Sequence, residues 1–182
     1  MHNSAEQILD QILVLDAQSG SVKAFEKLIL RWQKRFWWHA YNITGRTEAA
    51  WDITQESWLS IVKSVAGLKD PAKFGPWAYQ IVTRRAKDWL QRNSKEPVLP
   101  VERSDHVGLA DDRERSETAS DVHSIIRRLP ARSRSVLALY YFEGFGVAEV
   151  AKILDTAEGT VKSRLHTARR EFRKLWESLC ET

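Results

Sequence analysis

The chain has 182 residues, which is enough for one sizeable domain or two small ones, and its 28 Lys+Arg against 24 Asp+Glu give a modest net charge of +4. No run of about 18 apolar residues occurs and the N-terminus lacks the order of a signal peptide, so we expect a soluble, cytoplasmic protein with no membrane span. Cys180 is the only cysteine, which excludes an internal disulfide and a cysteine-based metal site.

Helical periodicity dominates the chain. Glycine and proline are scarce, no alternating strand pattern persists, and apolar residues recur at steps of three and four. We therefore predict an all-α fold.

Four helices are predicted in the first half. Ser4 and Gln7 form a capping box at the start of the first helix, Ser21 caps the second, Gly45 ends it, and Thr47 caps the third. The positions expected to face a core are Ala5, Ile8, Leu9, Ile12 and Leu13 in the first helix, Val22, Phe25, Leu28, Ile29, Trp32, Phe36, Ala40 and Ile43 in the second, and Ala50, Thr54, Trp58, Ile61, Val62 and Val65 in the third.

The third helix has a second face with a different composition. Its residues are Asp52, Gln55, Glu56 and Leu59, at steps of three, one and three. On the pattern alone, a solvated surface is the simpler interpretation of these acidic and amide side chains.

A loop over residues 67–76 precedes the fourth predicted helix, in which Pro76 suits the first position. The helix has a core stripe of Ala78, Ile81, Val82, Arg85, Ala86 and Trp89, and a basic face of Arg84, Arg85, Lys87 and Arg92. The aromatic residues at its start, Phe74, Trp77 and Tyr79, lie next to cations, a combination suited to stacking on unpaired bases. The alternative is that Trp77 and Phe74, or at least one of them, belong to the core.

The periodicity ends after residue 93 and resumes near residue 121. The intervening stretch, residues 94–120, contains seven acidic residues against four basic ones, together with prolines and serines. A long segment without a pattern is unusual inside a compact domain, so we interpret it as a flexible linker. The predicted organisation is a first domain at residues 1–93, the linker at 94–120 and a second domain at 121–182.

Four helices are predicted in the second half as well. Ser120 or Asp121 caps a helix through Val122, Ile125, Ile126 and Leu129, and a second helix covers residues 131–143 and ends at Gly144. A short helix over residues 147–154 is followed by a turn at 155–157 and a long helix from Glu158. A short helix, a tight turn and a longer basic helix form a helix-turn-helix.

The long helix is amphipathic. Its apolar stripe consists of Val161, Leu165, Ala168, Phe172, Leu175, Trp176 and Leu179, and its other side presents Lys162, Ser163, Arg164, His166, Thr167, Arg169, Arg170 and Arg173. A lone basic helix is equally consistent with a solvated surface. In a helix-turn-helix, such a face favours binding in the major groove of DNA.

Several motifs of this chain occur in the order found in bacterial RNA polymerase sigma factors of the extracytoplasmic-function (ECF) group. Residues 24–28 (AFEKL) and 40–45 (AYNITG) are similar to region 2.1, residues 52–58 (DITQESW) to region 2.2, residues 74–90 (FGPWAYQIVTRRAKDWL) to regions 2.3 and 2.4, and residues 129–134 (LPARSR), 147–154 (VAEVAKIL) and 158–165 (EGTVKSRL) to region 4. The chain thus resembles this family over nearly its whole length.

The resemblance implies two helical domains and a role for each predicted surface. Asp52, Gln55, Glu56 and Leu59 would bind the clamp helices of the largest RNA polymerase subunit, which replaces the solvated-surface interpretation. Lys69, Lys73, Phe74, Trp77, Tyr79, Arg84, Arg85, Lys87 and Arg92 would capture and melt the −10 element. Thr160, Lys162, Ser163, Arg164 and His166 would read the −35 element, with Arg169, Arg170 and Arg173 on phosphates. Further implied partners are the flap of the second-largest polymerase subunit and an anti-sigma factor.

The sequence departs from the family pattern at several positions. The turn after Leu154 lacks the usual glycine and proline, Gly75-Pro76 replaces bulkier residues, and Thr167 stands where an arginine is common. Asp155 can adopt the left-handed conformation that the turn requires. The pair Trp37-Trp38 has no role that the resemblance explains.

Two other classes of function fit the sequence less well. A stand-alone helix-turn-helix regulator would need the second domain but not the acidic face of the third helix. An enzyme is disfavoured because the five histidines fall on different predicted elements without partners for a triad or a metal, and no glycine-rich phosphate loop occurs. We therefore expect no catalysis, no cofactor and no metal.

Overall fold

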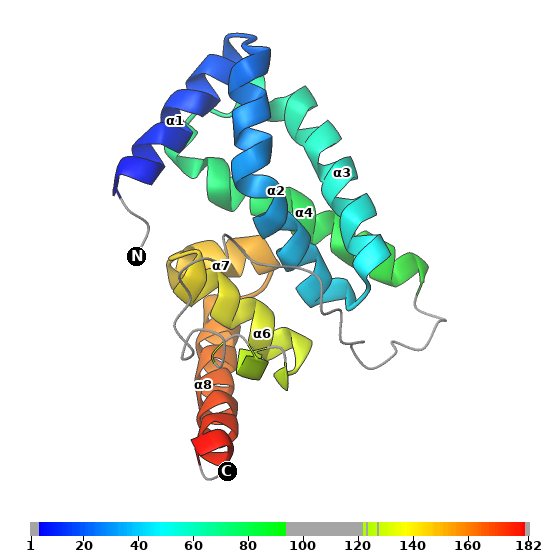
Figure 1. The fold of residues 1–182 in the computed structure, drawn as a ribbon, viewed down its shortest axis with the longest axis vertical. Helices are drawn as coiled ribbons and strands as arrows, with labels where there is room; N and C mark the ends of the chain where they lie inside the picture. The colour runs from blue at the N-terminus through cyan, green and yellow to red at the C-terminus, as the bar shows by residue number, and fades with distance from the viewer. Residues whose placement is uncertain (1–3, 94–121, 123, 127, 181–182) are drawn as a thin grey trace.

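The computed structural model describes residues 4–93, 122, 124–126 and 128–180, and every regular element in these ranges is a helix (Figure 1). The first domain contains α1 (Ser4–Gln18), α2 (Val22–Thr44), α3 (Thr47–Ser64), the short helices η1 (Val65–Gly67) and η2 (Pro71–Lys73), and α4 (Phe74–Arg92). The second contains α6 (Ala131–Leu137), η3 (Ala138–Phe142), α7 (Val147–Leu154) and α8 (Glu158–Cys180). The predicted all-α, two-domain fold is confirmed, while the predicted linker lies outside the described residues.

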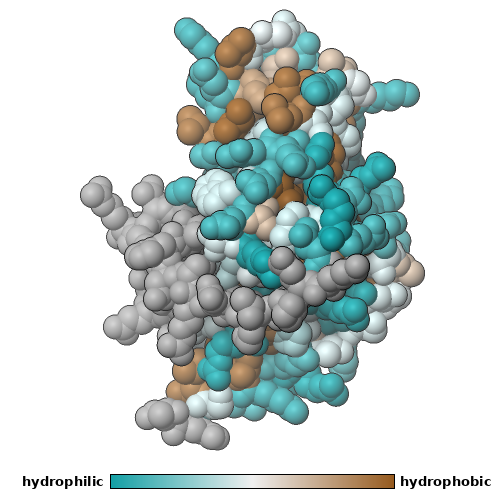
Figure 2. All heavy atoms as spheres, turned by 90° about the vertical axis from the view of Figure 1, so that its right-hand side faces the viewer, coloured by the Kyte–Doolittle hydropathy of each residue, from teal (hydrophilic) through white to brown (hydrophobic). Residues whose placement is uncertain are grey.

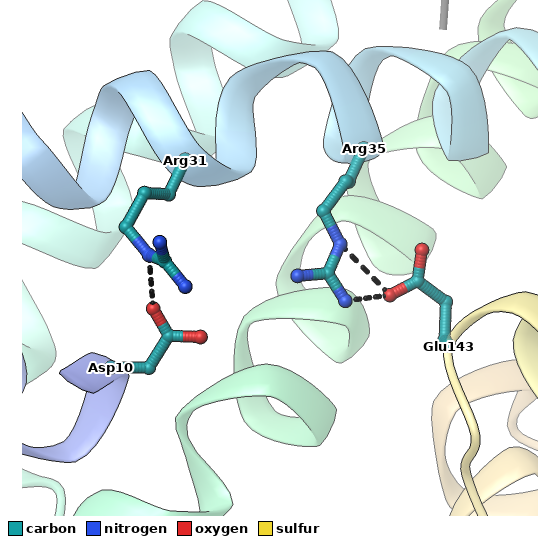
Figure 3. Close-up of polar contacts among 4 residues, drawn as sticks. All are labelled: Asp10, Arg31, Arg35 and Glu143. Carbon is teal, nitrogen blue, oxygen red and sulfur yellow. Dashed lines mark hydrogen bonds and ion pairs between the residues drawn. The ribbon is translucent and has the colours of Figure 1, made fainter. Parts of the chain in front are cut away.

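The helix α1 packs along α2 through only part of the apolar face expected for it. Leu13 and Val14 are buried, whereas Ile8, Leu9 and Ile12 are exposed. The ion pair between Asp10 and Arg31, with 2.6 Å between Oδ1 and Nε, fastens α1 to α2 from the side (Figure 3). The prediction for Ile8, Leu9 and Ile12 was therefore wrong, because the elements that pack on α1, which are α2, η1, η2 and α4, leave this side of the helix uncovered.

Rings from three helices fill the core of the first domain. Trp32 and Phe36 of α2 lie 5.5 Å apart between ring centroids, and Phe36 also contacts Trp58 of α3 and Tyr79 of α4 at 5.2 and 5.3 Å. Such aromatic pairs stabilise a core beyond their buried area. Two expected core residues lie outside this cluster, since Val22 and Val62 are exposed.

Both ends of α2 follow the local sequence, whereas the starts of α3 and α4 differ from the prediction. The Ser21 hydroxyl accepts a hydrogen bond from the Ala24 amide, and Gly45 ends α2 in the left-handed conformation at φ 70°. Arg46, not Thr47, occupies the N-cap of α3. The helix α4 begins at Phe74, so Pro76 is its third residue. The sequence had predicted Pro76 at the first position of this helix.

The second domain contains the predicted helix-turn-helix. The expected helix over residues 131–143 is α6 followed by a π-helical turn, η3, and Gly144 then turns the chain at φ 69°. The turn between α7 and α8 depends on Asp155, which has φ 50° and ψ 63°, as the sequence predicted for this position. The buried stripe of α8 starts with Val161, Leu165 and Ala168 and ends before Leu179, which is exposed.

The two domains pack against each other. The helix α7 lies on α4, and α6 lies on α2, so the start of the second domain lies beneath the first domain (Figure 1). The helix α8 points away from the first domain in the same view. Among the described residues, no helix combines the length and the apolar character needed to cross a membrane.

Candidate nucleic-acid interface

The helix α8 presents a basic, hydroxyl-bearing face opposite its buried stripe. Lys162, Ser163, His166 and Arg170 are exposed on this face, and Thr160 is half-buried at its start. Because α7 and the left-handed residue Asp155 fix the angle at which α8 leaves the core, the face projects as one rigid surface. A face of this composition can bind base edges and phosphates in a major groove.

Two of the predicted phosphate contacts lie at the edge of this face. The Arg169 guanidinium donates a hydrogen bond from Nε to the Tyr141 hydroxyl at 2.7 Å and lies over the rings of Tyr140 and Tyr141, at 5.9 and 5.6 Å from their centroids. Arg173 lines a neighbouring groove. Arg164, at the opposite edge, is half-buried and faces the first domain across a cavity between the two domains.

The groove beside Arg173 has a volume of about 640 Å³. Its apolar walls come from the helical segment before α6, from α6 and η3, and from α8, and they contain Val122, Ile126, Leu137, Phe142, Phe172 and Trp176. The open groove can receive apolar side chains from a partner, and the arginines at its rim can contact polar groups around them. The sequence placed Val122, Ile126, Phe172 and Trp176 on the apolar sides of helices and indicated no groove between them.

The basic face of the first domain is partly covered by the second domain. Lys69, Arg84 and Arg92 are exposed. Lys73 donates to Glu149 of α7 at 2.9 Å, and Lys87 donates to the Leu154 carbonyl oxygen at 2.8 Å. The second lysine also lies 3.6 Å from the Asp155 carboxylate.

The aromatic residues of this surface do not all reach solvent. Phe74 and Tyr79 are each 1% exposed, because they pack against Trp32 and belong to the core of the first domain. Trp77 is half-buried. At Phe74 the structure agrees with the alternative that this ring is core, whereas the burial of Tyr79 differs from the expectation that it stacks on bases. The spacing of Phe74, Ala78 and Val82 at steps of four indicated that Phe74 lies on the buried stripe of α4.

The acidic and amide face of α3 is exposed as a continuous surface. Asp52, Gln55 and Glu56 lie on it with Leu59, which is 61% exposed. Figure 2, which faces the α3 side of the molecule, shows hydrophobic residues gathered in its upper part above a mostly hydrophilic middle. Arg85 of α4 donates to Glu56 at 2.7 Å and fixes that carboxylate at the edge of the face.

A partly buried ion pair between the domains was not predicted from the sequence. Arg35 of α2 donates through Nε to Glu143 Oε2 at 3.0 Å and also through Nη2 to the same oxygen (Figure 3). Burial alone would lower the pKa of Arg35, but the Glu143 carboxylate and Tyr79 outweigh it and raise the pKa above its ordinary value. Arg35 therefore stays cationic, and its guanidinium lies over the Trp32 ring at 3.9 Å.

Trp37 and Trp38 have a structural role near the second domain, where both rings pack on Tyr41. Trp37 stacks on Tyr41 with 5.1 Å between ring centroids, and Trp38 stacks on the same tyrosine at 5.9 Å. Tyr41 interacts in turn with Arg134 of α6. Burial lowers the pKa of Arg134 below its ordinary value, and Tyr41 offsets part of this decrease. The tryptophans thus support the part of α2 that packs against α6.

A buried histidine joins α2 to α4. His39 is 2% exposed, its Nε2 lies 2.8 Å from the Thr83 hydroxyl, and its ring meets Tyr79 edge to face at 5.0 Å. Burial lowers its pKa to about 3. The imidazole is therefore neutral at physiological pH and serves the core.

Comparisons with known proteins match both domains. The Sigma-70 region 2 family model matches residues 28–96, and the Sigma-70, region 4 family model matches residues 119–172. The chain is 32% identical over 158 residues to the ECF RNA polymerase sigma factor SigM of Mycobacterium tuberculosis, covering 86% of this chain and 79% of that protein. It is 29% identical over 178 residues to the ECF RNA polymerase sigma-E factor of Haemophilus influenzae, covering 91% and 94%.

Two solved structures share the fold. One is the sigma factor RpoE of Bartonella quintana in complex with the anti-sigma factor NepR, with a TM-score of 0.64 and 21% identity, covering 86% of this chain and 98% of that one. The other is CnrH in complex with the cytosolic domain of CnrY, with a TM-score of 0.61 and 22% identity, covering 93% and 98%.

Proposed function

The chain belongs to the ECF RNA polymerase sigma factors, which makes it a promoter-directing transcription initiation factor, and from this premise we propose a role for each of its surfaces. The proposed units are region 2 at residues 1–93, a linker at 94–120 and region 4 at 121–182. Region 2 would bind the polymerase and melt the −10 element, and region 4 would read the −35 element. The observation that carries this division is the rigid basic face of α8 on a helix-turn-helix.

Recognition of the −35 element is assigned to the exposed side of α8. Thr160, Lys162, Ser163 and His166 are placed to meet base edges, with Arg164 at the border of the face. Arg169, Arg170 and Arg173 are all exposed and would contact phosphates. The Tyr141 hydroxyl orients Arg169 in advance.

Capture of the −10 element is assigned to α4 and the segment before it. Lys69, Arg84 and Arg92 offer exposed cations. Lys73 and Lys87 are hydrogen-bonded to the second domain, and Arg85 is hydrogen-bonded to Glu56. Trp77 offers a partly accessible ring. An unpaired base outside the stack costs a few kcal/mol unless a pocket holds it. Phe74 and Tyr79 would support that surface from the core.

Two surfaces are assigned to the polymerase. The exposed face of Asp52, Gln55, Glu56 and Leu59 on α3 would bind the clamp helices of the largest subunit. The apolar groove between η3 and α8 would receive the flap of the second-largest subunit, because a groove with hydrophobic walls and arginines at its rim suits an apolar helix end.

The remaining proposals follow from the family. The protein would act in the bacterial cytoplasm, catalyse no reaction itself, and be held inactive by an anti-sigma factor. RpoE of Bartonella quintana, which shares the fold, was solved with such a partner. A stand-alone DNA-binding regulator gains no support from the exposed α3 face, which it would not need.

The assignment of the α3 face is tested by binding to purified core RNA polymerase. Asp52→Lys reverses a charge within the face and leaves the Arg85–Glu56 contact intact, whereas Glu26→Lys makes the same change on an exposed part of α2. We expect Asp52→Lys to weaken binding at least about tenfold and the control to leave it unchanged. Equal affinities for the two variants would contradict the assignment.

A further inference from the structure

A cavity of about 370 Å³ lies between the two domains, at the place where α2 and α4 of the first approach α6 and α7 of the second. Its apolar wall contains Ile43 of α2, Leu90 of α4 and Leu154 of α7. Binding sites for small organic molecules begin at about this volume and combine apolar walls with a few polar groups. The cavity therefore has the size and the apolar surface to hold a molecule as large as a nucleotide.

Three cations from three helices line the same cavity. They are Lys87 of α4, Arg132 of α6 and Arg164 of α8. Lys87 donates to the Leu154 carbonyl oxygen, whereas neither arginine has an acidic partner within the described part of the chain. The lining contains one carboxylate, on Asp155, whose side chain is 93% exposed. The cavity thus has an excess of positive charge, and its two guanidinium groups are suited to binding a phosphate.

A fully buried amide belongs to the wall of this cavity. Asn42 of α2 is 0% exposed, and neither its Nδ2 nor its Oδ1 has a hydrogen-bond partner among the described residues. A buried polar group without a partner costs free energy, so a ligand that reaches this wall and pairs with the amide gains affinity. The amide presents a donor and an acceptor side by side, which is the pattern that asparagine uses to bind the N6 and N7 edge of adenine.

We propose that this cavity is a binding site for a small adenine nucleotide, of the size of adenosine monophosphate. Arg132 and Arg164 would bind the phosphate, with Lys87 adding positive charge. The Asn42 amide would pair with the edge of the base, and the apolar wall would cover the ring. The proposal needs only the cavity and its lining residues, so it does not rest on the roles assigned above to the DNA and polymerase surfaces. It would make the protein responsive to the concentration of a nucleotide.

The first measurement is isothermal titration calorimetry of the full chain with three probes, which are adenosine monophosphate, ribose 5-phosphate and adenosine. Only the first of them carries both the phosphate and the base. We expect adenosine monophosphate to bind at least about tenfold more tightly than either of the other two, because each of those lacks the group that one end of the cavity recognises. Absence of binding at millimolar adenosine monophosphate would overturn the proposal.

The second measurement locates the phosphate. Arg132→Gln and Arg164→Gln each remove one guanidinium from the cavity, and neither side chain is buried, so both variants should fold. The matched control, Lys174→Gln, removes the same charge from an exposed position of α8 outside the cavity. We expect each arginine variant to bind adenosine monophosphate about tenfold more weakly and the control to change the affinity by about twofold or less. Equal weakening in all three variants would show a general attraction between charges and overturn the site.

The third measurement concerns the amide. Asn42→Ala removes both polar atoms from the wall, and circular dichroism checks that the variant is folded. We expect it to weaken binding of adenosine monophosphate by about tenfold and that of ribose 5-phosphate by about twofold or less, because only the nucleotide carries the base. The same loss for both ligands, or no loss for the nucleotide, would contradict recognition of the base by Asn42. The two arginine variants test the site even if Asn42→Ala does not fold.

Discussion

The buried histidine predicts a specific loss of stability in mild acid. His39 has an ordinary pKa of 6.5 and a folded-state pKa of about 3, because burial penalises its charged form. Above pH 6.5 the imidazole is neutral in both the folded and the unfolded chain. As the pH falls below 6.5, the unfolded chain takes up a proton that the folded chain refuses, so the free energy of unfolding decreases by about 1.4 kcal/mol per pH unit until the folded pKa is reached.

The expected loss between pH 7 and pH 5 is about 2 kcal/mol from this one residue. The measurement is urea unfolding at both pH values, for the native chain and for His39→Gln. Glutamine can place a polar group near the position of Nε2, 2.8 Å from the Thr83 hydroxyl, but it does not titrate. The native chain should lose about 2 kcal/mol more than the variant over this pH range, and equal losses would refute the assignment of a neutral, buried imidazole.

Three further predictions concern single positions. Asp155→Val should lower the free energy of unfolding by about 1–2 kcal/mol in urea titrations while Asp155→Gly leaves it nearly unchanged, because φ at this residue is 50°; equal effects would contradict a left-handed turn. Gly75→Ala should destabilise by about 1–2 kcal/mol in the same assay, since its Cβ would lie 2.9 Å from Trp32; a stabilised variant would show that this ring moves away readily. Lys162→Ala should cost about 1–3 kcal/mol of binding free energy at one base pair of the −35 element, whereas Arg170→Ala should weaken binding to all sequences alike and reduce its salt dependence. The measurement is binding to single-base promoter variants at several salt concentrations. Identical profiles for the two variants would refute the division of roles.

Much of the fold could be predicted because local signals agree with tertiary packing. Ser21, Gly45 and Asp155 mark helix ends by chemistry that acts within a few residues, and the structure uses each of them as expected. The apolar stripe of α8 was predicted well in its first half for the same reason. The family resemblance then supplied the order of the motifs, which local patterns do not contain.

The errors arise where a helix has neighbours on one side only. The residues Ile8, Ile12 and Val62 follow helical spacing, yet they are exposed because no other element covers them. The pattern shows that a stripe exists and leaves open which edge of it meets the core. At Phe74 and Tyr79 the error was of another kind, since ring chemistry fits both base stacking and a core, and burial decides between them.

The contacts between the domains could not be predicted from the sequence. Nothing in the spacing of Arg35 and Glu143 indicates that they meet, because they lie 108 residues apart in different domains. The same holds for Lys73 and Glu149. Charged residues on helix surfaces are common, so only the packed structure distinguishes a paired carboxylate from a solvated one.

Promoter-directed run-off transcription most directly tests initiation by this protein. Purified core RNA polymerase and the protein are combined with genomic fragments that the complex retains at moderate salt, and transcripts are compared with those from core polymerase alone. We expect discrete transcripts that require the protein, that decrease with Asp52→Lys, and that remain with Glu26→Lys. Transcripts of equal amount and start site with and without the protein would contradict its role as an initiation factor.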